Sequence, residues 1–350
     1  MSGYRLQASQ VVARPLEEVF DFFSRPENLG RITPPSMGFQ QLSTDVAMRR
    51  GLEIDHRIRP LPGISMRWRS RIDAYDPPHG FTDIQVRGPY RRWLHQHRFT
   101  EVDGGTRIDD DVSYAMPLGP LGSLAHAAAV HAPLLEIFWY RARAVAAIFE
   151  PRATAEAPMT VGVAGGTGFV GGAIAAELHR RGQRVVVISH RGESSRGILP
   201  DDVELRRADV TTGDGLPDAL VGLDGLVVAL AFQNSPIESP RRGQTFMAVD
   251  AAGTERLVAA ARQTRIGRLV YLSGAGAAPD ADRHWFRAKW RAETAIRESG
   301  IPSTIIRPTW IYGPRDVSLN RFLGFARLLQ AVPMTNRGRQ LLAPVFIDDV

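Results

Sequence analysis

Cysteine is absent from this chain of 350 residues. Without a thiol, the protein forms no disulfide bond and offers no cysteine nucleophile or thiolate metal ligand. Long apolar runs are missing as well, since none reaches the roughly 18 residues that a membrane-spanning helix needs. The N-terminus also lacks the basic and then apolar pattern of a signal peptide. We therefore expect a cytoplasmic protein with no membrane span.

Lysine is almost absent too. Lys289 is the only lysine, so arginine supplies the other 42 of the 43 basic residues. This bias predicts a specific need for an ammonium group at that one position. The formal net charge of +6 would suit an anionic partner. However, basic and acidic residues are interspersed along the chain, and we therefore expect no nucleic-acid partner.

The length allows two domains, each large enough to bury its own core. Residues 151–159 read PRATAEAPM, which mixes proline and alanine without apolar periodicity. This composition is typical of a linker. We therefore expect one domain over residues 1–150 and a second over residues 160–350.

The most informative stretch of the second domain is Thr160–Gly172, TVGVAGGTGFVGG. A short apolar run predicts a buried parallel strand, and helical periodicity follows the glycines up to Gly182. Strand, glycine turn and helix form the setting of a dinucleotide fingerprint, where the backbone and a helix N-terminus approach a pyrophosphate. The residues expected at the pyrophosphate are Gly165, Gly166, Thr167, Gly168, Phe169, Val170 and Gly171.

The next predicted strand, Arg184–Ser189, carries the specificity for the cofactor. An acidic residue at its end would bind the ribose hydroxyls of NAD, but this strand runs into Ser189-His190-Arg191. Arg191 would attract the 2′-phosphate of NADP. NADP is therefore favoured, and NAD stays an alternative because arginine can also stack near an adenine. The further residues expected beside the cofactor are Asp209, Val210 and Ala229.

Regular alternation of strands and helices over residues 160–350 predicts a doubly wound parallel sheet. The order GGTGFVG, Asp209-Val210, VDAAGTERLVAAA, VYLSGAG, the single lysine and RPTWIYGP resembles the short-chain dehydrogenase/reductase superfamily. It is most similar to atypical extended members related to the 39-kDa subunit of respiratory complex I and to NmrA-like proteins. The resemblance implies a Rossmann domain that binds NAD(P).

The same resemblance implies catalytic residues. The family uses a serine or threonine at the end of the fifth strand and a Tyr-x-x-x-Lys pair on the next helix, which Ser273 and Lys289 match in part. The tyrosine position is Trp285, and an indole cannot shuttle a proton. Two functions therefore stay open. One is an NADP(H)-dependent, epimerase-like oxidoreductase acting on an apolar small molecule, and the other is a non-catalytic NAD(P)H sensor or assembly subunit.

The last residues, Pro344–Val350, resemble the strand-to-helix junction of extended members. A substrate-covering region follows that junction in the family. We expect this C-terminal region to be missing from the sequence.

The first domain shows a different order of elements. A strand (4–13), short helices (14–23 and 26–31), a run of strands (52–59, 64–75, 81–87, 90–102, 106–116) and a helix interrupted at Pro133 (124–149) are expected. This α+β order resembles the START-like helix-grip fold of the SRPBCC, or polyketide cyclase/dehydrase-type, proteins. That family implies a cavity for an apolar small molecule between the sheet and the last helix.

The run GPYRRWLHQHRF, residues 88–99, places Trp93, His95 and His97 on one strand face. These side chains are either half-buried with their hydrogen bonds satisfied within the protein, or they contact the ligand. The i, i+2 spacing of the histidines could also hold a metal completed by Glu53 or Asp55, but we predict no metal site. Whether the chain has a protein partner or forms a homo-oligomer is left open.

Overall fold

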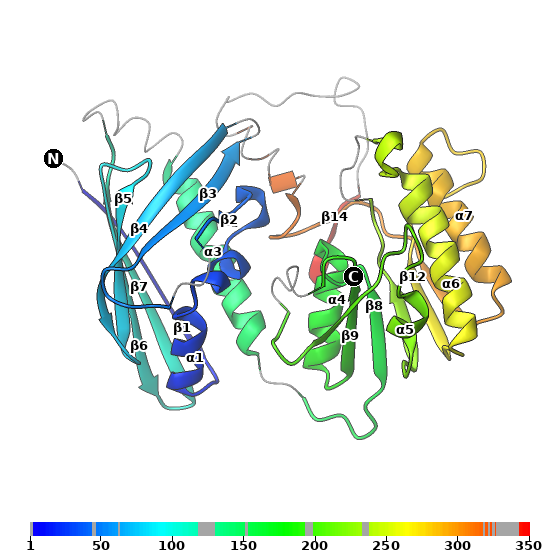
Figure 1. The fold of residues 1–350 in the computed structure, drawn as a ribbon, viewed down its shortest axis with the longest axis horizontal. Helices are drawn as coiled ribbons and strands as arrows, with labels where there is room; N and C mark the ends of the chain where they lie inside the picture. Colours follow the sequence, from blue (N-terminus) through cyan, green and yellow to red (C-terminus); the bar gives the residue numbers. More distant parts are fainter. Residues whose placement is uncertain are drawn as a thin grey trace. The chain divides into compact units, whose positions relative to one another are not determined.

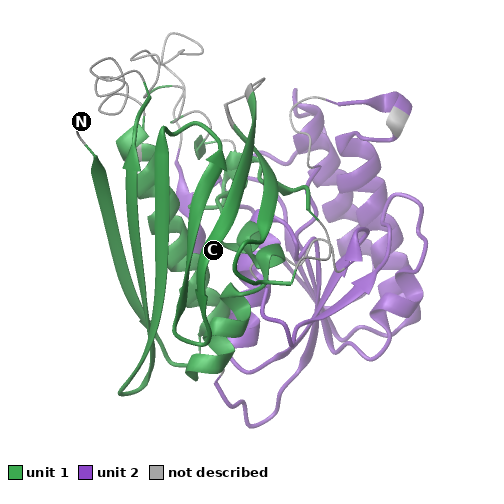
Figure 2. Cartoon of the chain, turned by 60° about the vertical axis from the view of Figure 1, so that its left-hand side comes forward, with its two compact units in different colours: residues 1–151, 314–340 green, residues 152–313, 341–350 purple. Residues whose placement is uncertain are grey.

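The computed structural model describes residues 3–43, 47–61, 64–117, 130–150, 153–192, 199–232, 238–317, 319–320, 323, 326 and 343–350. The chain divides into two compact units (Figure 2). Unit 1 comprises residues 1–151 and 314–340, and unit 2 comprises residues 152–313 and 341–350. The sequence predicted a single crossing between domains, whereas residues 314–340 group with unit 1.

Unit 1 is built on a seven-stranded antiparallel sheet in the order β1-β7-β6-β5-β4-β3-β2 (Figure 1). Alternating buried and solvent-facing residues, clearest in β6 and β7, explain why these segments form a half-buried sheet. Its elements are β1 (Tyr4–Val12), α1 (Leu16–Phe23), the 3₁₀ helices η1 (Pro26–Ile32) and η2 (Pro35–Met37), β2 (Gln40–Gln41), β3 (Glu53–Leu61), β4 (Ile64–Asp76), β5 (Gly80–Arg87), β6 (Arg92–Val102), β7 (Gly105–Ala115) and α3 (His131–Phe149).

Helix α3 packs on one face of this sheet. Leu134 and Phe138 of α3 join a buried cluster with Leu6, Trp93 and Tyr114. The predicted interruption at Pro133 is instead the first turn of α3, where a proline has no intrahelical N–H to lose. The earlier part of the predicted helix, residues 124–129, lies outside the described residues.

Unit 2 is built on a six-stranded parallel sheet in the order β10-β9-β8-β11-β12-β13, which is the doubly wound order 3-2-1-4-5-6. Its elements are β8 (Thr160–Ala164), α4 (Phe169–Arg180), β9 (Arg184–Ser189), β10 (Glu204–Arg207), α5 (Leu216–Leu220), β11 (Gly225–Val228), the 3₁₀ helix η5 (Pro240–Arg242), the π-helix η6 (Met247–Ala252), α6 (Gly253–Gln263), β12 (Arg268–Leu272), α7 (His284–Glu298) and β13 (Ser303–Ile306).

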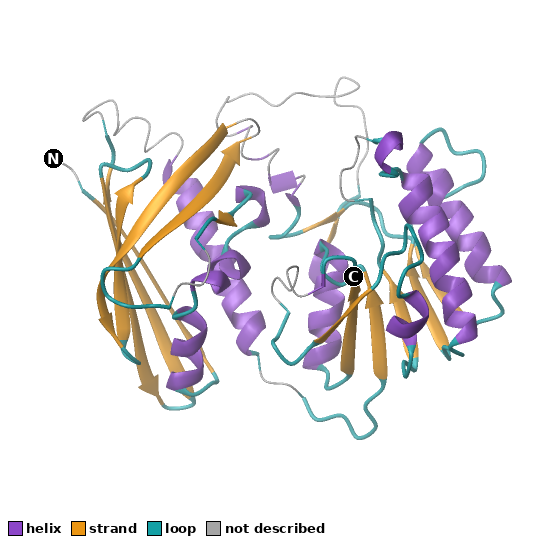
Figure 3. Ribbon diagram, viewed as in Figure 1, coloured by secondary structure: helices purple, strands orange, loops and turns teal. Residues whose placement is uncertain are grey.

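Both faces of the parallel sheet are covered by helices (Figure 3). Val163 and Val187 point to the face that carries Ala175 of α4. Their neighbours Ala164 and Ile188 point to the opposite face, where α5, α6 and α7 supply the rest of a larger core. Because both faces are buried, the strands read as continuous apolar runs in the sequence. The chain reverses its winding between β8 and β11, so a crevice opens at their carboxyl ends.

The predicted linker is partly packed. The backbone N–H of Ala153 donates to the carbonyl of Arg180 at 2.8 Å, and the N–H of Met159 donates to the Gln183 side chain at 2.8 Å. The last carbonyls of a helix lack intrahelical donors, and this segment supplies one for α4. Residues 153–159 are therefore packed against the rest of unit 2 and do not form a flexible linker.

The chain's final described residues form β15 (Val345–Phe346) and the 3₁₀ turn η8 (Ile347–Asp349). Strand β15 pairs in parallel with β14 (Ile311–Tyr312). Among the helices of the described ranges, none is both long enough and apolar enough to span a membrane.

Candidate functional site

The glycine turn between β8 and α4 is packed too closely for side chains. Gly165 has a φ of +82°, and a Cβ there would lie 2.6 Å from the carbonyl oxygen of Ala229 at the end of β11. A Cβ on Gly171 would lie 2.3 Å from the carbonyl oxygen of Gly165. The turn therefore presses against β11 on one side and against α4 on the other, as the fingerprint requires.

The middle glycine leaves room for a ligand. Gly168 is the N-cap of α4, and a Cβ there would meet only the Gly165 carbonyl, at 3.2 Å. The first helical hydrogen bond runs from Gly172 N–H to Gly168 C=O at 3.0 Å. The amides of the first turn, Phe169 to Gly171, precede it and have no intrahelical acceptor. Together with the helix dipole, these N–H groups fit a pyrophosphate.

The residues predicted for the adenosine end follow neighbouring strands. Arg191 lies just beyond β9, where its backbone N–H donates to the Ser189 hydroxyl at 3.2 Å and its side chain is exposed. Asp209 lies just beyond β10, and its Oδ1 accepts from the N–H and the hydroxyl of Thr211 at 2.7 and 2.6 Å. Burial raises the pKa of Asp209, but the hydrogen bonds from Thr211 outweigh this effect. The net pKa lies below its usual value, and the carboxyl stays ionised. Val210 follows it.

Lys289 lies on α7 and is only 3% exposed. Its ammonium donates to the carbonyl oxygens of Leu230 at 2.9 Å and Leu272 at 3.2 Å. The Nζ atom also lies 3.0 Å from Oδ1 of Asp250. Two hydrogen bonds to backbone carbonyls and one ion pair therefore enclose the ammonium. Sequence reasoning anticipated a special role for this lysine but not this enclosure.

Asp250, the partner of Lys289, is fully buried in the π-helix η6. Its Oδ2 accepts from the backbone N–H of Phe232 at 3.1 Å. Burial raises the pKa of Asp250, and the nearby Lys289 ammonium opposes that shift. A π-turn is rare and is frequently found at functional sites. The sequence offered one overlooked signal, a lone acid within the apolar stretch MAVDAA.

Ser273 lies just after β12 and is also buried. Its hydroxyl donates to Oε1 of Glu293 at 2.5 Å. The same carboxylate accepts from Arg307 at 2.8 and 2.6 Å and from Arg297 at 2.6 Å. Burial raises the pKa of Glu293, but the hydrogen bonds from Arg307 and Ser273 pull it below its usual value. The Ser273 hydroxyl hydrogen is thus donated to the carboxylate of Glu293, a partner that the sequence did not predict.

Trp285 occupies the position of the family's tyrosine, in the first turn of α7. Its ring stacks on Phe286 with centroids 4.9 Å apart and packs against the buried cluster of Phe232, Phe246 and Ala288. Tyr271 is fully buried in β12, and burial raises the pKa of its hydroxyl. The tyrosine position therefore carries an apolar packing residue instead of an acid.

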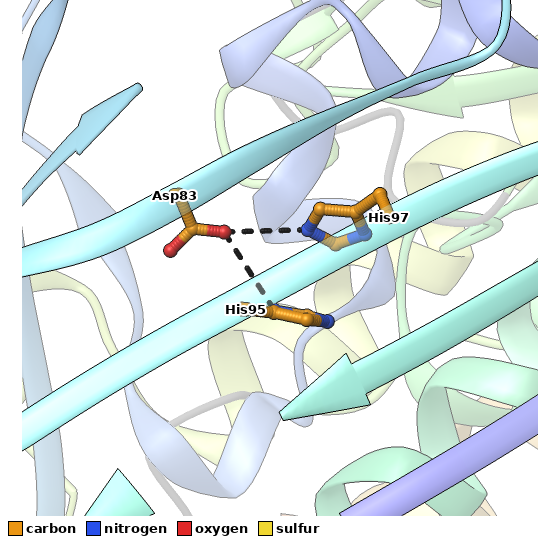
Figure 4. A group of neighbouring side chains, drawn as sticks. All are labelled: Asp83, His95 and His97. Carbon is orange, nitrogen blue, oxygen red and sulfur yellow. Dashed lines mark hydrogen bonds and ion pairs between the residues drawn. The ribbon is translucent and has the colours of Figure 1, made fainter. Parts of the chain in front are cut away.

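A second polar cluster lies on the inner face of the unit 1 sheet. His95 and His97 of β6 face Asp83 of β5 (Figure 4). On their other side lies Asp110 of β7. Asp110 Oδ1 lies 3.0 Å from His95 Nε2 and 2.7 Å from His97 Nδ1. Arg141 of α3 approaches Asp110 Oδ2 at 3.2 Å. Trp93, on the same face, belongs instead to an aromatic group with Trp68, Tyr90 and Tyr114.

The charges of this cluster are strongly coupled. Burial and the neighbouring His97 lower the pKa of His95, whereas the carboxylates raise the pKa of His97 against its burial. Burial raises the pKa of Asp110, but Arg141 and the histidines outweigh it and hold the pKa well below its usual range. The sequence missed Asp83, Asp110 and Arg141, because strand register and the placement of α3 cannot be read from residue spacing.

Glu53 and Asp55, the carboxylates offered in the sequence to complete a metal site, lie elsewhere. Asp55 forms an exposed ion pair with Arg69 at 2.8 Å, and Glu53 lies 3.4 Å from the same guanidinium. They belong to the opposite face of β3 from buried His56, because successive side chains alternate. That part of the metal hypothesis is wrong.

A hollow of about 500 Å³ is lined by residues of β1 and β4 to β7, including Asp76, Arg98 and Asp111. None of its lining residues comes from α3. It therefore differs from the cavity that the helix-grip resemblance implies between the sheet and the last helix.

Comparison with known protein families agrees with the two units. The sequence model of the NAD dependent epimerase/dehydratase family matches residues 161–350. The model described as "Polyketide cyclase / dehydrase and lipid transport" matches residues 4–146. The N-terminal domain is thus of the SRPBCC type, as its element order predicted.

Curated relatives match about half of the chain. The mitochondrial NADH-ubiquinone oxidoreductase 40 kDa subunit of Neurospora crassa is 24% identical over 196 residues, which cover 55% of this chain and 50% of the relative. The mitochondrial NADH dehydrogenase [ubiquinone] 1 alpha subcomplex subunit 9 of Arabidopsis thaliana is 27% identical over 195 residues, covering 54% and 47%. The chain therefore spans about half the length of these relatives.

Among solved structures, a nucleoside-diphosphate sugar epimerase from Corynebacterium glutamicum is similar at 21% identity and a TM-score of 0.49, with 98% of this chain and 73% of that chain covered. The family match extends over more than half of this chain and includes the glycine turn, Ser273 and Lys289. Together with the 3-2-1-4-5-6 sheet, it identifies the chain as a member of the NAD dependent epimerase/dehydratase family that carries an N-terminal SRPBCC domain.

Proposed function

We propose that unit 2 binds NADP(H) as a ligand that reports its own occupancy, without consuming it. The observation that carries this proposal is the enclosure of Lys289. Its ammonium is surrounded by Leu230 O, Leu272 O and Asp250 Oδ1, at 2.9, 3.2 and 3.0 Å. A lysine that holds a nicotinamide ribose needs free donors, and breaking this buried ion pair to free one would be costly.

The other two members of the expected catalytic group support the same conclusion. Ser273 donates its only hydroxyl hydrogen to Glu293, so it has none to polarise a substrate oxygen. Trp285 has no ionisable group to transfer a proton. Hydride transfer to a carbonyl requires a proton as well, and none of these side chains supplies it.

Arg191 supports a preference for NADP over NAD. Its exposed guanidinium follows the end of β9, the strand whose end meets the adenosine ribose in dinucleotide-binding folds. An arginine there suits a 2′-phosphate, whereas an acidic residue would repel it. NAD remains the alternative ligand, and the experiments below measure its affinity beside that of NADP.

The SRPBCC domain suggests what the dinucleotide signal is coupled to. We infer that unit 1 captures an apolar small molecule, because that class of fold offers a cavity between the sheet and the last helix. His95, His97 and Trp93 lie on the sheet face that α3 covers. A protein partner, or a second copy of the chain, would then receive the signal.

A second function, an NADP(H)-dependent oxidoreductase acting on that apolar molecule, is favoured by one observation. Ser273 and Lys289 keep the family's positions after β12 and on α7. In that case Ser273 would have to leave Glu293, and the proton would have to come from water or the substrate.

Dinucleotide titration followed by an assay for turnover separates the two functions. Quenching of tryptophan fluorescence should show binding of NADPH to the full chain, with weaker binding of NADP, NADH and NAD. Absorbance should then show no loss of NADPH when quinones or apolar ketones are added. Gly171→Ala is the non-binding control, because its Cβ would collide with Gly165. NADPH consumption that Ser273→Ala abolishes would establish the oxidoreductase, and failure of all four dinucleotides to bind would refute both functions.

Replacing Arg191 tests the choice of cofactor. Arg191→Ala should weaken NADPH binding about tenfold, the effect of one charge-assisted contact, and leave NADH binding nearly unchanged. Calorimetric titration of both dinucleotides measures the ratio. Arg262→Ala, which removes an exposed arginine of α6, is the matched control. Equal losses for NADPH and NADH would contradict a role at the 2′-phosphate.

Lys289 and Asp250 should be strongly coupled in stability. Lys289→Met leaves a buried carboxylate without its cation and should cost about 3–5 kcal/mol. Adding Asp250→Asn removes that charge and should recover at least about 1 kcal/mol in urea unfolding. The exposed pair Arg291–Glu255, 2.5 Å apart, joins α7 to α6. Its own double-mutant cycle should give a coupling of only about 1 kcal/mol or less. Additive effects of the Lys289 and Asp250 changes would show that the pair is not the anchor inferred here.

The Glu293 cluster predicts a pH dependence of stability. The pKa of Glu293 is lower in the folded chain than its unfolded value of roughly 4.3. Its carboxylate therefore stabilises the fold at neutral pH, and this stabilisation is lost as the pH falls below the unfolded value. Glu293→Gln should be about 2 kcal/mol less stable than the wild type at pH near 7, and the gap should close in acid. Urea midpoints across pH measure it, with exposed Glu298→Gln as the control. A gap independent of pH would exclude the charge as its cause.

A further inference from the structure

Three side chains of unit 1 converge from two neighbouring strands. Asp83 of β5 stands opposite His95 of β6, and Phe81 stands opposite His97. Residues opposite one another share a sheet face, so Asp83, His95 and His97 point to the same side (Figure 4). One ligand atom from each lies within 4.8 Å of the other two.

The separations match those of ligands on one metal ion. Oδ2 of Asp83 lies 3.3 Å from Nε2 of His97 and 3.7 Å from Nδ1 of His95. Two ligands bound to Zn²⁺ at about 2.05 Å with tetrahedral angles are about 3.3 Å apart. The two separations from Asp83 therefore lie within about 0.4 Å of the distance expected between ligands of one cation.

The outer nitrogens of both rings are held by a single carboxylate. Asp110 Oδ1 lies 3.0 Å from His95 Nε2 and 2.7 Å from His97 Nδ1. Arg141 donates to His97 Nδ1 at 3.2 Å, and His97 Nε2 lies 3.3 Å from Asp83 Oδ2, so the hydrogen of this ring lies on Nε2, toward Asp83. His95 Nε2 is paired with Asp110, so the lone pair of His95 Nδ1 faces Asp83. A cation bound here would replace the Nε2 hydrogen of His97, and Nδ1 would then carry a hydrogen beside Asp110. Metal-binding histidines are oriented by this kind of carboxylate contact.

The charges of the surroundings leave room for a cation. Arg141 neutralises Asp110, with Nε 3.2 Å from Oδ2. Among the ion pairs of the described residues, none joins Asp83 to a guanidinium, and its carboxylate faces only the two histidine rings. A divalent cation could therefore take the place of the hydrogen that Asp83 now shares with His97. The Asp83 side chain is 18% exposed, which leaves an approach from solvent.

We propose that Asp83, His95 and His97 form a binding site for a divalent transition-metal cation such as Zn²⁺ or Fe²⁺. Two imidazoles and one carboxylate are a donor set that suits these ions, and three protein ligands leave positions open for water or a small molecule. Asp110 is the positioning residue that orients both rings, and Arg141 keeps it ionised. The site belongs to unit 1 and requires nothing from the dinucleotide site.

Co²⁺ tests the site directly, because its visible absorption reports coordination by nitrogen and oxygen. The full chain, stripped with a chelator, should take up one equivalent of Co²⁺, and Zn²⁺ should displace it. His95→Gln, His97→Gln and Asp83→Asn should each weaken Co²⁺ binding at least about 100-fold, whereas Asp110→Asn should weaken it about 10- to 100-fold. His79→Gln, which changes an exposed histidine of the same unit, should bind as the wild type does.

Near-ultraviolet circular dichroism shows whether each variant folds, and Asp83→Asn is the nearly isosteric change on which the test depends. Folded Asp83→Asn that binds Co²⁺ as tightly as the wild type would overturn the proposal. So would a wild-type chain that takes up no Co²⁺, which would mean that a proton alone occupies the space between Asp83 and His97. Retained binding in His97→Gln would place the cation elsewhere and would also overturn it.

Discussion

The buried ammonium of Lys289, on α7, joins that helix to the ends of two strands of the parallel sheet and to the π-helix η6. It donates to the carbonyl of Leu230, just beyond β11, and to that of Leu272 at the end of β12, and it forms an ion pair with Asp250 in the π-helix. Asp250 in turn accepts from the N–H of Phe232, in the loop after β11. The ammonium of Lys289 is thus buried at the carboxyl ends of the strands. A buried ion pair of this kind is costly to break.

A buried ion pair also organises the polar cluster of unit 1. Asp110 and Arg141 form a buried pair, 3.2 Å apart, around which two histidines are arranged. In unit 2, the ammonium of Lys289 is enclosed by Asp250 and by the carbonyl oxygens of Leu230 and Leu272. In unit 1, Asp110 lies beside one nitrogen of each ring, Nε2 of His95 and Nδ1 of His97, and the other nitrogens face Asp83. A buried charge can therefore restrict or create chemistry, depending on which neighbours it satisfies.

Much of this architecture could be predicted. The long strands of unit 1 were expected within one or two residues of their bounds, because turn clusters such as Asp103-Gly104-Gly105 separate them clearly. Strand β2 was missed because two residues are too short to show a period. The fingerprint glycines were recognised by spacing, and close approaches at Gly165 and Gly171 explain why those positions need glycine. The packing of residues 153–159 against the rest of unit 2 and the grouping of residues 314–340 with unit 1 could not be predicted. Both depend on contacts between segments that are distant in the sequence.

The residue types and their spacing in the sequence were enough to predict the two fold classes, the dinucleotide fingerprint, the single lysine and the tryptophan in place of tyrosine. Folding does not alter residue type or spacing. The side chains that hydrogen-bond to the functional groups could not be predicted in this way. Asp250 meets Lys289 across 39 positions of the chain, Glu293 meets Ser273 across 20, and Asp110 meets His95 across 15. Strand register and helix packing bring these pairs together, and burial then makes each interaction strong enough to govern what the site can do.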